Sequence, residues 1–220
     1  NFMQLKKRLS SLKPYVAGKP FSDQVYLKLN ANECPFPLPK SVYRAASKLR
    51  GIHRYQEGSG LQLRKSIEAH TGISAQQIIL GNGSGELILL FLLAFLEKDK
   101  NVVIPEGTFS LYSMYSLINE NACVRVPLDA KWHMNLSALK AAVTSQTGAL
   151  FLCNPNNPTG HSYSYEEIEQ FLSQIPSSVA VFLDEAYIHY SPFYNENKIK
   201  ILIQNFSNLF VLRTFSKLGL

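Results

Sequence analysis

The sequence predicts an α/β fold in which a mainly parallel sheet is flanked by helices. Short runs of β-favouring residues, each bounded by Gly, Pro, Asn or Asp, alternate along the chain with stretches whose apolar residues recur at helical spacing. Such alternation is typical of parallel sheets with crossover helices. The composition agrees, because 46% of the 220 residues are hydrophobic and 17% are charged, which is enough apolar material for a sizeable core.

The N-terminal segment departs from this alternation. Its first residues mix basic and apolar positions, and we expect a helix at its start. Pro35, Pro37 and Pro39 then remove backbone donors and fix the backbone, which excludes regular structure around them. The pattern therefore predicts an arm over residues 1–40.

Helices and strands are predicted in order along the rest of the chain. Helices are expected at 41–50 and 61–70, with Gly51 and Gly72 at the positions of left-handed caps. A later helix begins after Ser164, because Ser164 and Glu167 have the spacing of a capping box. The remaining helices are expected at 84–98 and 111–119, and the strands at 78–80, 102–104, 122–126, 149–153, 179–183 and 209–212.

Charge and composition exclude several classes of protein. The formal net charge is +6, but the basic residues are scattered, so nucleic-acid binding is not expected and attraction of an anionic cofactor and anionic substrates is the milder interpretation. Cys34, Cys123 and Cys153 lie far apart without metal-ligand spacing, which predicts no disulfide, no metal site and a reducing cytoplasm. The longest apolar run, 87–96, is too short to span a bilayer, and we expect no membrane segment or secretory signal.

In a parallel sheet the ligand lies at the carboxyl ends of the strands, so the residues after each strand carry the functional prediction. The glycine-rich residues 81–86 follow the first expected strand and open a helix, which is typical of a phosphate cradle. Residues 154–160 form a loop in which two prolines hold asparagine carboxamides in place. Taken alone, the glycine-rich segment is more often a plain turn, and the asparagine-rich loop is equally well explained as a turn.

The last two expected strands end in an acid and an amine. Asp184 follows one strand, with Tyr187 three residues on, and Lys217 follows the other. Alone, a strand-end aspartate is commonly a turn former or a metal ligand, and such a lysine is ordinarily a solvated charge. Together, however, the four segments supply a phosphate cup, a hydrogen bond for a ring hydroxyl, an acid for a pyridine nitrogen and an amine for an aldehyde, which are the needs of pyridoxal phosphate.

At these residues the sequence resembles the fold-type-I pyridoxal-phosphate-dependent aminotransferases. The resemblance covers nearly the whole chain, and its specific stretches are Asn-Pro-Asn-Asn-Pro-Thr-Gly at 154–160, Asp-Glu-Ala-Tyr at 184–187 and Arg-Thr-Phe-Ser-Lys at 213–217. It implies that residues 41–220 are the large cofactor-binding domain and that residues 1–40 are the arm with part of a small domain. The rest of the small domain would be absent.

The resemblance also implies roles for individual residues. Lys217 would hold the cofactor as a Schiff base and then move the substrate proton as a general base. Asp184 would keep the pyridine nitrogen protonated. The other cofactor-binding residues implied are Asn157 and Tyr187 at the ring hydroxyl, Phe109 stacked on the ring, and Ser84, Gly85, Thr214 and Ser216 at the phosphate.

Two tyrosines extend the implied site. Tyr55 is similar to a tyrosine that reaches the cofactor phosphate of a partner subunit, which implies a homodimer, although a tyrosine partly buried on its own subunit is the alternative. Residues 12–20 and 29–33 resemble those of family members that act on histidinol phosphate. Tyr15 would meet the substrate phosphate, with Asn157 also near the substrate, or else Tyr15 packs on the arm. The implied reaction is amino transfer from histidinol phosphate to 2-oxoglutarate.

The chain also departs from the family pattern. Gly85 stands where an acid is usual and Phe109 where a tyrosine is usual, so a phosphate-site contact and a phenolic hydrogen bond would be lost, without effect on the core chemistry. The arginines that follow the lysine in the family would lie beyond Leu220, so we expect the chain to stop within the fold. Rival interpretations are an aromatic aminotransferase, a decarboxylase of a phosphorylated amino acid, and a non-catalytic fragment that binds the cofactor.

Overall fold

The computed structural model describes residue 9 and residues 29–51, 53–55 and 57–217. These residues divide into two compact units. The larger comprises residues 81–214, and the smaller comprises residues 29–80 together with 215–217. The helix predicted at the start of the arm, and Tyr15, lie outside the described residues.

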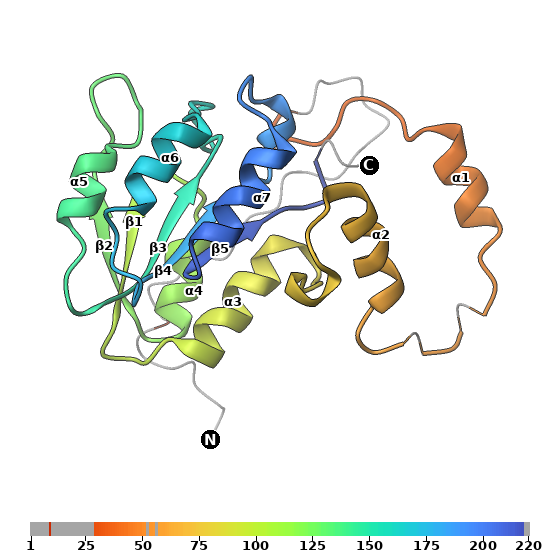
Figure 1. Ribbon diagram of the computed structural model, residues 1–220, viewed down its shortest axis with the longest axis horizontal. Helices are drawn as coiled ribbons and strands as arrows, with labels where there is room; N and C mark the ends of the chain where they lie inside the picture. Colours follow the sequence, from red (N-terminus) through yellow and green to blue (C-terminus); the bar gives the residue numbers. More distant parts are fainter. Residues whose placement is uncertain (1–8, 10–28, 52, 56, 218–220) are drawn as a thin grey trace. The chain divides into compact units, whose positions relative to one another are not determined.

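The larger unit is built on a five-stranded sheet in which every strand pair is parallel, as the sequence predicts (Figure 1). The strands lie in the order β2-β1-β3-β4-β5, so the chain crosses over between β2 and β3. In the pairing of β3 with β4, Cys153 lies opposite Asp184, which brings the ends of these two strands together. The strands are β1 (Asn101–Pro105), β2 (Ala122–Val126), β3 (Thr147–Cys153), β4 (Ala180–Asp184) and β5 (Leu209–Leu212).

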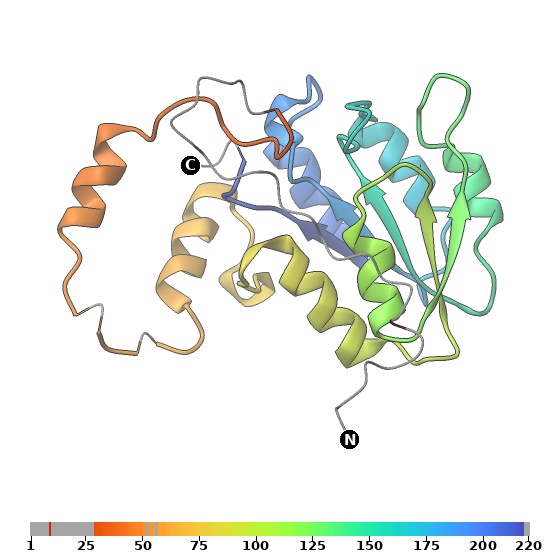
Figure 2. The same cartoon turned by 180° about the vertical axis from the view of Figure 1, so that it is seen from behind.

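Successive side chains of a strand point to opposite faces of the sheet, and the side chains on both faces are apolar. Both faces are therefore covered by helices. One core cluster joins α3 (Gly83–Phe95) and α4 (Leu111–Ile118) to one face. The other joins α5 (Leu136–Ala141), α6 (Tyr165–Leu172) and α7 (Glu196–Asn205) to the opposite face, and Figure 2 shows the same layers from behind. Successive residues of β4 therefore face different helices.

Helix caps explain several of the boundaries. The capping box of α6 is confirmed, since the Ser164 side chain accepts from the backbone of Glu167 and the Glu167 carboxylate accepts from the Ser164 backbone. Helices α5 and α7 lie outside the predicted ranges, and their N-caps are Asn135 and Asn195, whose side chains accept backbone N–H bonds of the first turn. A short 3-10 helix, η3 (Ile188–Tyr190), follows β4.

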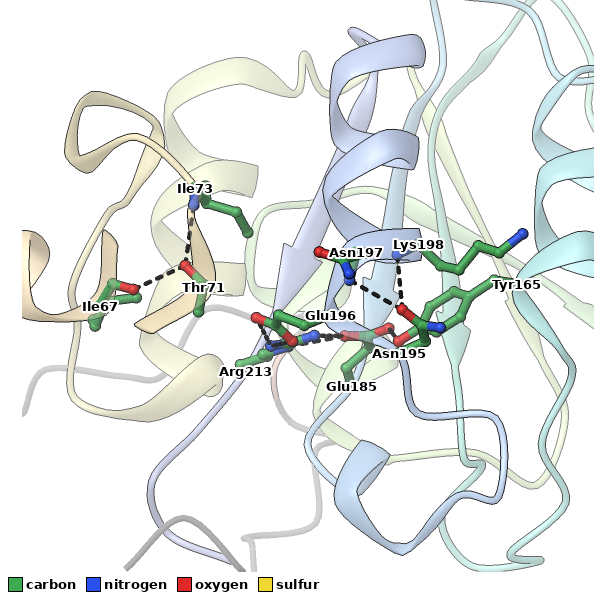
Figure 3. A network of polar contacts seen from close by, with 10 residues as sticks. All are labelled: Ile67, Thr71, Ile73, Tyr165, Glu185, Asn195, Glu196, Asn197, Lys198 and Arg213. Carbon is green, nitrogen blue, oxygen red and sulfur yellow. Dashed lines mark hydrogen bonds and ion pairs between the residues drawn. The ribbon is translucent and has the colours of Figure 1, made fainter. Parts of the chain in front are cut away.

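The smaller unit contains α1 (Lys40–Ser47), α2 (Leu61–Thr71) and a 3-10 helix, η2 (Ala75–Gln77). Gly72 caps α2 with a φ of 69°, as predicted, and Thr71 bonds the chain on either side of it (Figure 3).

Two predictions in the smaller unit are wrong. The helix before Gly51 ends at Ser47, so Gly51, at φ +70°, does not cap it but begins a later turn in which its carbonyl accepts from Arg54. Residues 78–80 form no strand, because they follow the 3-10 helix as a short stretch with Ile79 exposed and no described strand is hydrogen-bonded to them.

Candidate active site

Asn157, Asp184 and Tyr187, which are predicted to contact the cofactor ring, lie at the carboxyl ends of β3 and β4. The Asn154 backbone N–H donates to the Asp184 carbonyl at 2.8 Å, which ties the loop after β3 to the end of β4. The Asn154 side chain in turn exchanges two hydrogen bonds with the backbone of Tyr163, at 2.8 and 3.0 Å. These bonds fix both ends of the loop from which Asn157 projects.

Asp184 is a buried carboxylate with neutral donors only. Its side chain is 2% exposed. The Tyr112 hydroxyl donates to Oδ2 at 2.6 Å, and the Ala186 backbone N–H donates to Oδ1 at 3.0 Å. Burial raises the pKa of Asp184, and these two donors oppose the increase. Among the described residues, no Lys, Arg or His forms an ion pair with it, so its charge is stabilised by hydrogen bonds alone.

Asn157 and Tyr187 lie close enough to act on one ligand atom. The Asn157 Nδ2 donates to the Tyr187 hydroxyl at 3.4 Å, although the two residues follow different strands. The neighbouring Asn156 is buried and accepts from Thr108 at 2.8 Å, while its own amide donates to Thr159 at 3.0 Å. This network makes the loop a rigid support on which a carboxamide and a phenol are fixed side by side.

The buried Cys153 at the end of β3 is not a nucleophile. Burial, assisted by the charge of Asp184, raises its pKa to about 12, so the thiol is protonated at neutral pH. Its sulfur lies 3.3 Å from the Pro155 carbonyl and accepts from the Asn157 backbone at 3.4 Å. Cys153 therefore supports the same loop.

The predicted phosphate cradle is the first turn of α3. Gly83, Ser84 and Gly85 begin this helix, whose first amides have no partner within the helix. The Glu86 carboxylate accepts from the Asn82 backbone at 2.6 Å, and the hydrogen bonds from Asn82 lower the pKa of Glu86. A Cβ at Gly85 would lie 3.2 Å from Leu111 Cδ1, so an acid at this position would press against α4.

The last segment of the predicted site is divided between the units. Thr214 ends the larger unit and is partly buried, whereas Ser216 and Lys217 belong to the smaller one. There, the Lys217 Nζ donates to the Ala31 carbonyl at 3.0 Å. The predicted amine is therefore in contact with one of the segments, residues 29–33, that suggest the substrate. Its position relative to Asp184 stays a prediction.

A second buried acid, Glu185, faces the other side of the sheet and is neutralised by protein groups (Figure 3). The Arg213 Nε donates a hydrogen bond to its Oε2 at 2.9 Å, the Arg213 Nη2 lies 2.8 Å from the same oxygen as an ion pair, and Tyr165 donates to Oε1 at 2.9 Å. Arg213 also bonds both carboxylate oxygens of Glu196 at 2.8 Å. Burial raises the pKa of Glu185, and the charge and hydrogen bond of Arg213 oppose this increase. Because a guanidinium stays protonated in proteins, we treat Glu185 and Arg213 as an ionised pair.

Sequence reasoning did not identify Tyr112 or the ion pair of Glu185 with Arg213. The available signals were local: Tyr112 follows Phe109 at helical spacing, and Glu185 and Arg213 each adjoin a predicted site residue. Phe109 itself is partly buried, with its ring centroid 5.6 Å from that of Tyr112. Tyr55 is fully exposed on the smaller unit, and its role stays a prediction.

Two other expectations concern absent features. In the part of the chain that the structure describes, no group of three or more His, Cys, Asp or Glu side chains could hold a metal ion. Within the same ranges, every helix is too short or too polar to cross a bilayer.

The chain belongs to the family of class I and II aminotransferases, whose family model matches residues 24–218. It is similar to histidinol-phosphate aminotransferase of Anoxybacillus flavithermus, with 34% identity over 98% of this chain and 60% of the relative. The chain spans about 60% of the length of the curated relatives it matches.

Solved structures agree with this assignment. The structure of a putative histidinol-phosphate aminotransferase from Erwinia carotovora atroseptica matches with a TM-score of 0.76 and 30% identity, over 86% of this chain and 56% of that one. Histidinol-phosphate aminotransferase from Sinorhizobium meliloti, solved in complex with pyridoxal-5'-phosphate, also has a TM-score of 0.76, with 25% identity over 85% of this chain and 51% of that one.

Proposed function

We propose that the protein carrying this chain catalyses amino transfer between histidinol phosphate and 2-oxoglutarate with pyridoxal phosphate as cofactor. The products would be imidazole acetol phosphate and glutamate. The observation that carries the proposal is Asp184, a buried acid at a strand end with neutral donors but no cationic partner among the described residues. The family supplies the chemical context, because its relatives are named aminotransferases and one of them was solved with pyridoxal-5'-phosphate.

The residues present fit the cofactor. A protonated pyridine nitrogen would supply the positive N–H group that the Asp184 carboxylate lacks. Asn157 and Tyr187, 3.4 Å apart, would both bond the ring hydroxyl, and Phe109 would cover the ring. The first-turn amides of α3 at Ser84 and Gly85 would bind the phosphate together with the hydroxyls of Thr214 and Ser216. These phosphate assignments rest on the family pattern.

Each chemical step then has a residue to perform it. When bound, the cofactor supplies an electron-withdrawing ring. Asp184 would keep a proton on the ring nitrogen. Lys217 would hold the cofactor through its amine and, once the amino donor had displaced it, would act as the base that moves the proton of the donor Cα.

The proposal extends to the substrate and the assembly. Histidinol phosphate is favoured over an aromatic amino acid because residues 29–33 resemble the substrate arm and touch Lys217 through Ala31. Tyr15 and Asn157 would meet the substrate.

Tyr55, fully exposed, would reach the cofactor phosphate of a partner subunit in a homodimer. We assign residues 1–40 to the arm and 41–220 to the large domain, and place the enzyme in the cytoplasm.

Turnover measurements on the protein expressed from its complete gene test the substrate. The value of kcat/KM for histidinol phosphate should exceed that for phenylalanine by about 10²-fold or more, since a site that binds a phosphate loses that interaction with the amino acid. Lys217→Ala should abolish turnover, and Lys198→Ala, which changes an exposed lysine paired with Glu166, should leave it intact. Preference for phenylalanine would reject the substrate, and an active Lys217→Ala variant would reject the site.

A further inference from the structure

Tyr112 is the buried side chain that contacts Asp184 most closely. It lies on α4 and is 0% exposed, and its hydroxyl donates to Asp184 Oδ2 at 2.6 Å. The two residues are 72 positions apart in the sequence, so the contact depends on the packing of α4 on the sheet. A charge-assisted bond of this length is among the stronger hydrogen bonds in a protein.

The Tyr112 ring is itself held by the core. It stacks on Phe151 with ring centroids 4.6 Å apart and an interplanar angle of 14°, and Phe151 stacks in turn on Phe182 at 4.7 Å. The edge of this assembly meets Phe109, at 5.6 Å and 85° from Tyr112. Aromatic contacts of these geometries are favourable beyond their buried area. The phenol therefore has little freedom to turn away from Asp184.

We propose that Tyr112 is a positioning residue of the cofactor site, which orients the Asp184 carboxylate through its hydroxyl and the Phe109 ring through its own ring. Tyr112 would thus hold in place both Asp184, which would bond the ring nitrogen, and Phe109, which would cover the ring. This inference rests on the proposed function, because it concerns the same site. Tyr112 acts through Asp184 and Phe109 and does not itself touch the reacting atoms.

The charges around Asp184 support this role. Burial and the charge of Asp184 raise the pKa of Tyr112 well above its ordinary value, so the hydroxyl stays a donor. Cys153 on β3, in the part of the chain that the structure describes, also faces Asp184, and its raised pKa keeps it a neutral thiol. No charged group of α4 or β3 thus competes with Tyr112 for the carboxylate, and the Tyr112 bond favours its ionised form.

The chain offers a matched control. Tyr165 donates to the buried Glu185 at 2.9 Å, one residue further along and on the other face of the sheet. Tyr112→Phe and Tyr165→Phe each remove one phenol hydroxyl from one buried carboxylate. The two variants differ only in which carboxylate loses its hydrogen bond. If the role of Tyr112 were purely structural, both variants would have similar effects on cofactor binding.

The experiment compares both variants with the wild-type protein, expressed from the complete gene and loaded with pyridoxal phosphate. Tyr112→Phe should raise the dissociation constant of pyridoxal phosphate, measured by dialysis, about tenfold, the loss expected for one charge-assisted bond. The pH midpoint of the bound cofactor's absorbance should rise by about one unit, because a less protonated ring withdraws fewer electrons from the bond to the lysine. The value of kcat should fall about tenfold with KM within about twofold.

Tyr165→Phe should leave the midpoint and the dissociation constant unchanged and should lower only the thermal stability. Equal effects of the two variants on the cofactor would overturn the positioning role, while cofactor binding by the wild type would leave the proposed function standing. A wild-type protein that binds no pyridoxal phosphate would instead overturn both.

A second variant keeps the inference testable if Tyr112→Phe does not fold. Fluorotyrosine incorporated at position 112 keeps the shape and the hydroxyl of the side chain but makes the phenol a stronger donor. It should retain cofactor affinity within about twofold and shift the absorbance midpoint downward, opposite to the loss of the hydroxyl. An unshifted midpoint in a folded, cofactor-loaded fluorotyrosine protein would contradict the inference.

Discussion

Asp184 and Glu185 are consecutive buried acids at the end of β4, and the two faces of the sheet treat them differently. On the α6 and α7 face, Glu185 is neutralised by Arg213 and bonded by Tyr165 (Figure 3). On the α3 and α4 face, Asp184 receives hydrogen bonds from Tyr112 and Ala186 but no described cation pairs with it. A buried charge is costly without a partner. We therefore propose a structural role for Glu185 and a ligand-binding role for Asp184.

The largest expected effect is on catalysis and concerns the acid without a cation. Asp184→Asn should lower kcat/KM for amino transfer by about 10³-fold, since it removes the electrostatic stabilisation of the ring nitrogen's proton. The free energy of unfolding of the cofactor-free protein should change by less than about 1 kcal/mol, because no described ion pair is broken. Steady-state kinetics and urea titration measure the two quantities. A large loss of stability with kinetics retained would reverse the roles of the two acids.

The neighbouring acid should show the converse pattern. Glu185→Gln should lower the free energy of unfolding by about 3 kcal/mol, because Arg213 would lose one of its two carboxylate partners. Urea titration measures this loss, and the kcat of the folded fraction should fall less than about tenfold. Unchanged stability would show that the ion pair is not structural.

A double replacement sharpens the same comparison. Replacing Glu185 by Leu and Arg213 by Met removes both charges of the pair, and it should recover most of the stability lost in Glu185→Gln, to within about 1 kcal/mol of wild type. Glu196 lies near the surface and can be solvated when Arg213 is replaced. Circular dichroism during urea unfolding gives the values. If the double variant is less stable than Glu185→Gln, Arg213 stabilises the fold chiefly through Glu196.

The smallest effect is on the pH dependence of stability. Burial raises the pKa of Asp184 in the folded protein above its unfolded value near 4, so the folded state binds the proton more tightly. The resulting stability is present below the unfolded pKa and is lost as the pH rises through the folded pKa. The cofactor-free wild type should therefore lose stability over this interval relative to Asp184→Asn. Urea titrations at a series of pH values check the sign, and a gain with rising pH would contradict it.

Much of the larger unit could be predicted from sequence because its signals are local. The capping box at Ser164 and the apolar runs that became β2 and β5 depend on residues next to one another in the chain. Residues 78–80 carry the same β-favouring signal and yet form no strand, since a strand also needs a partner.

The candidate site likewise contains residues that local sequence signals reveal and contacts that they do not. Asp184 stands out in the sequence because it follows a buried run, and the family pattern pairs Asn157 with Tyr187, which lie 3.4 Å apart. The contact of Tyr112 with Asp184 and that of Arg213 with Glu185 join residues 72 and 28 positions apart. Such contacts arise from the packing of helices on the sheet, which no local pattern specifies.

The central proposal is that Lys217 holds the cofactor as a Schiff base and that Asp184, which has no cationic partner among the described residues, serves the same cofactor. Borohydride reduction of the pyridoxal-phosphate-loaded protein, followed by peptide mass spectrometry, tests it most directly. The account predicts the reduced cofactor on Lys217, and none after Lys217→Ala. A label on another lysine, or a label that persists in the variant, would contradict it.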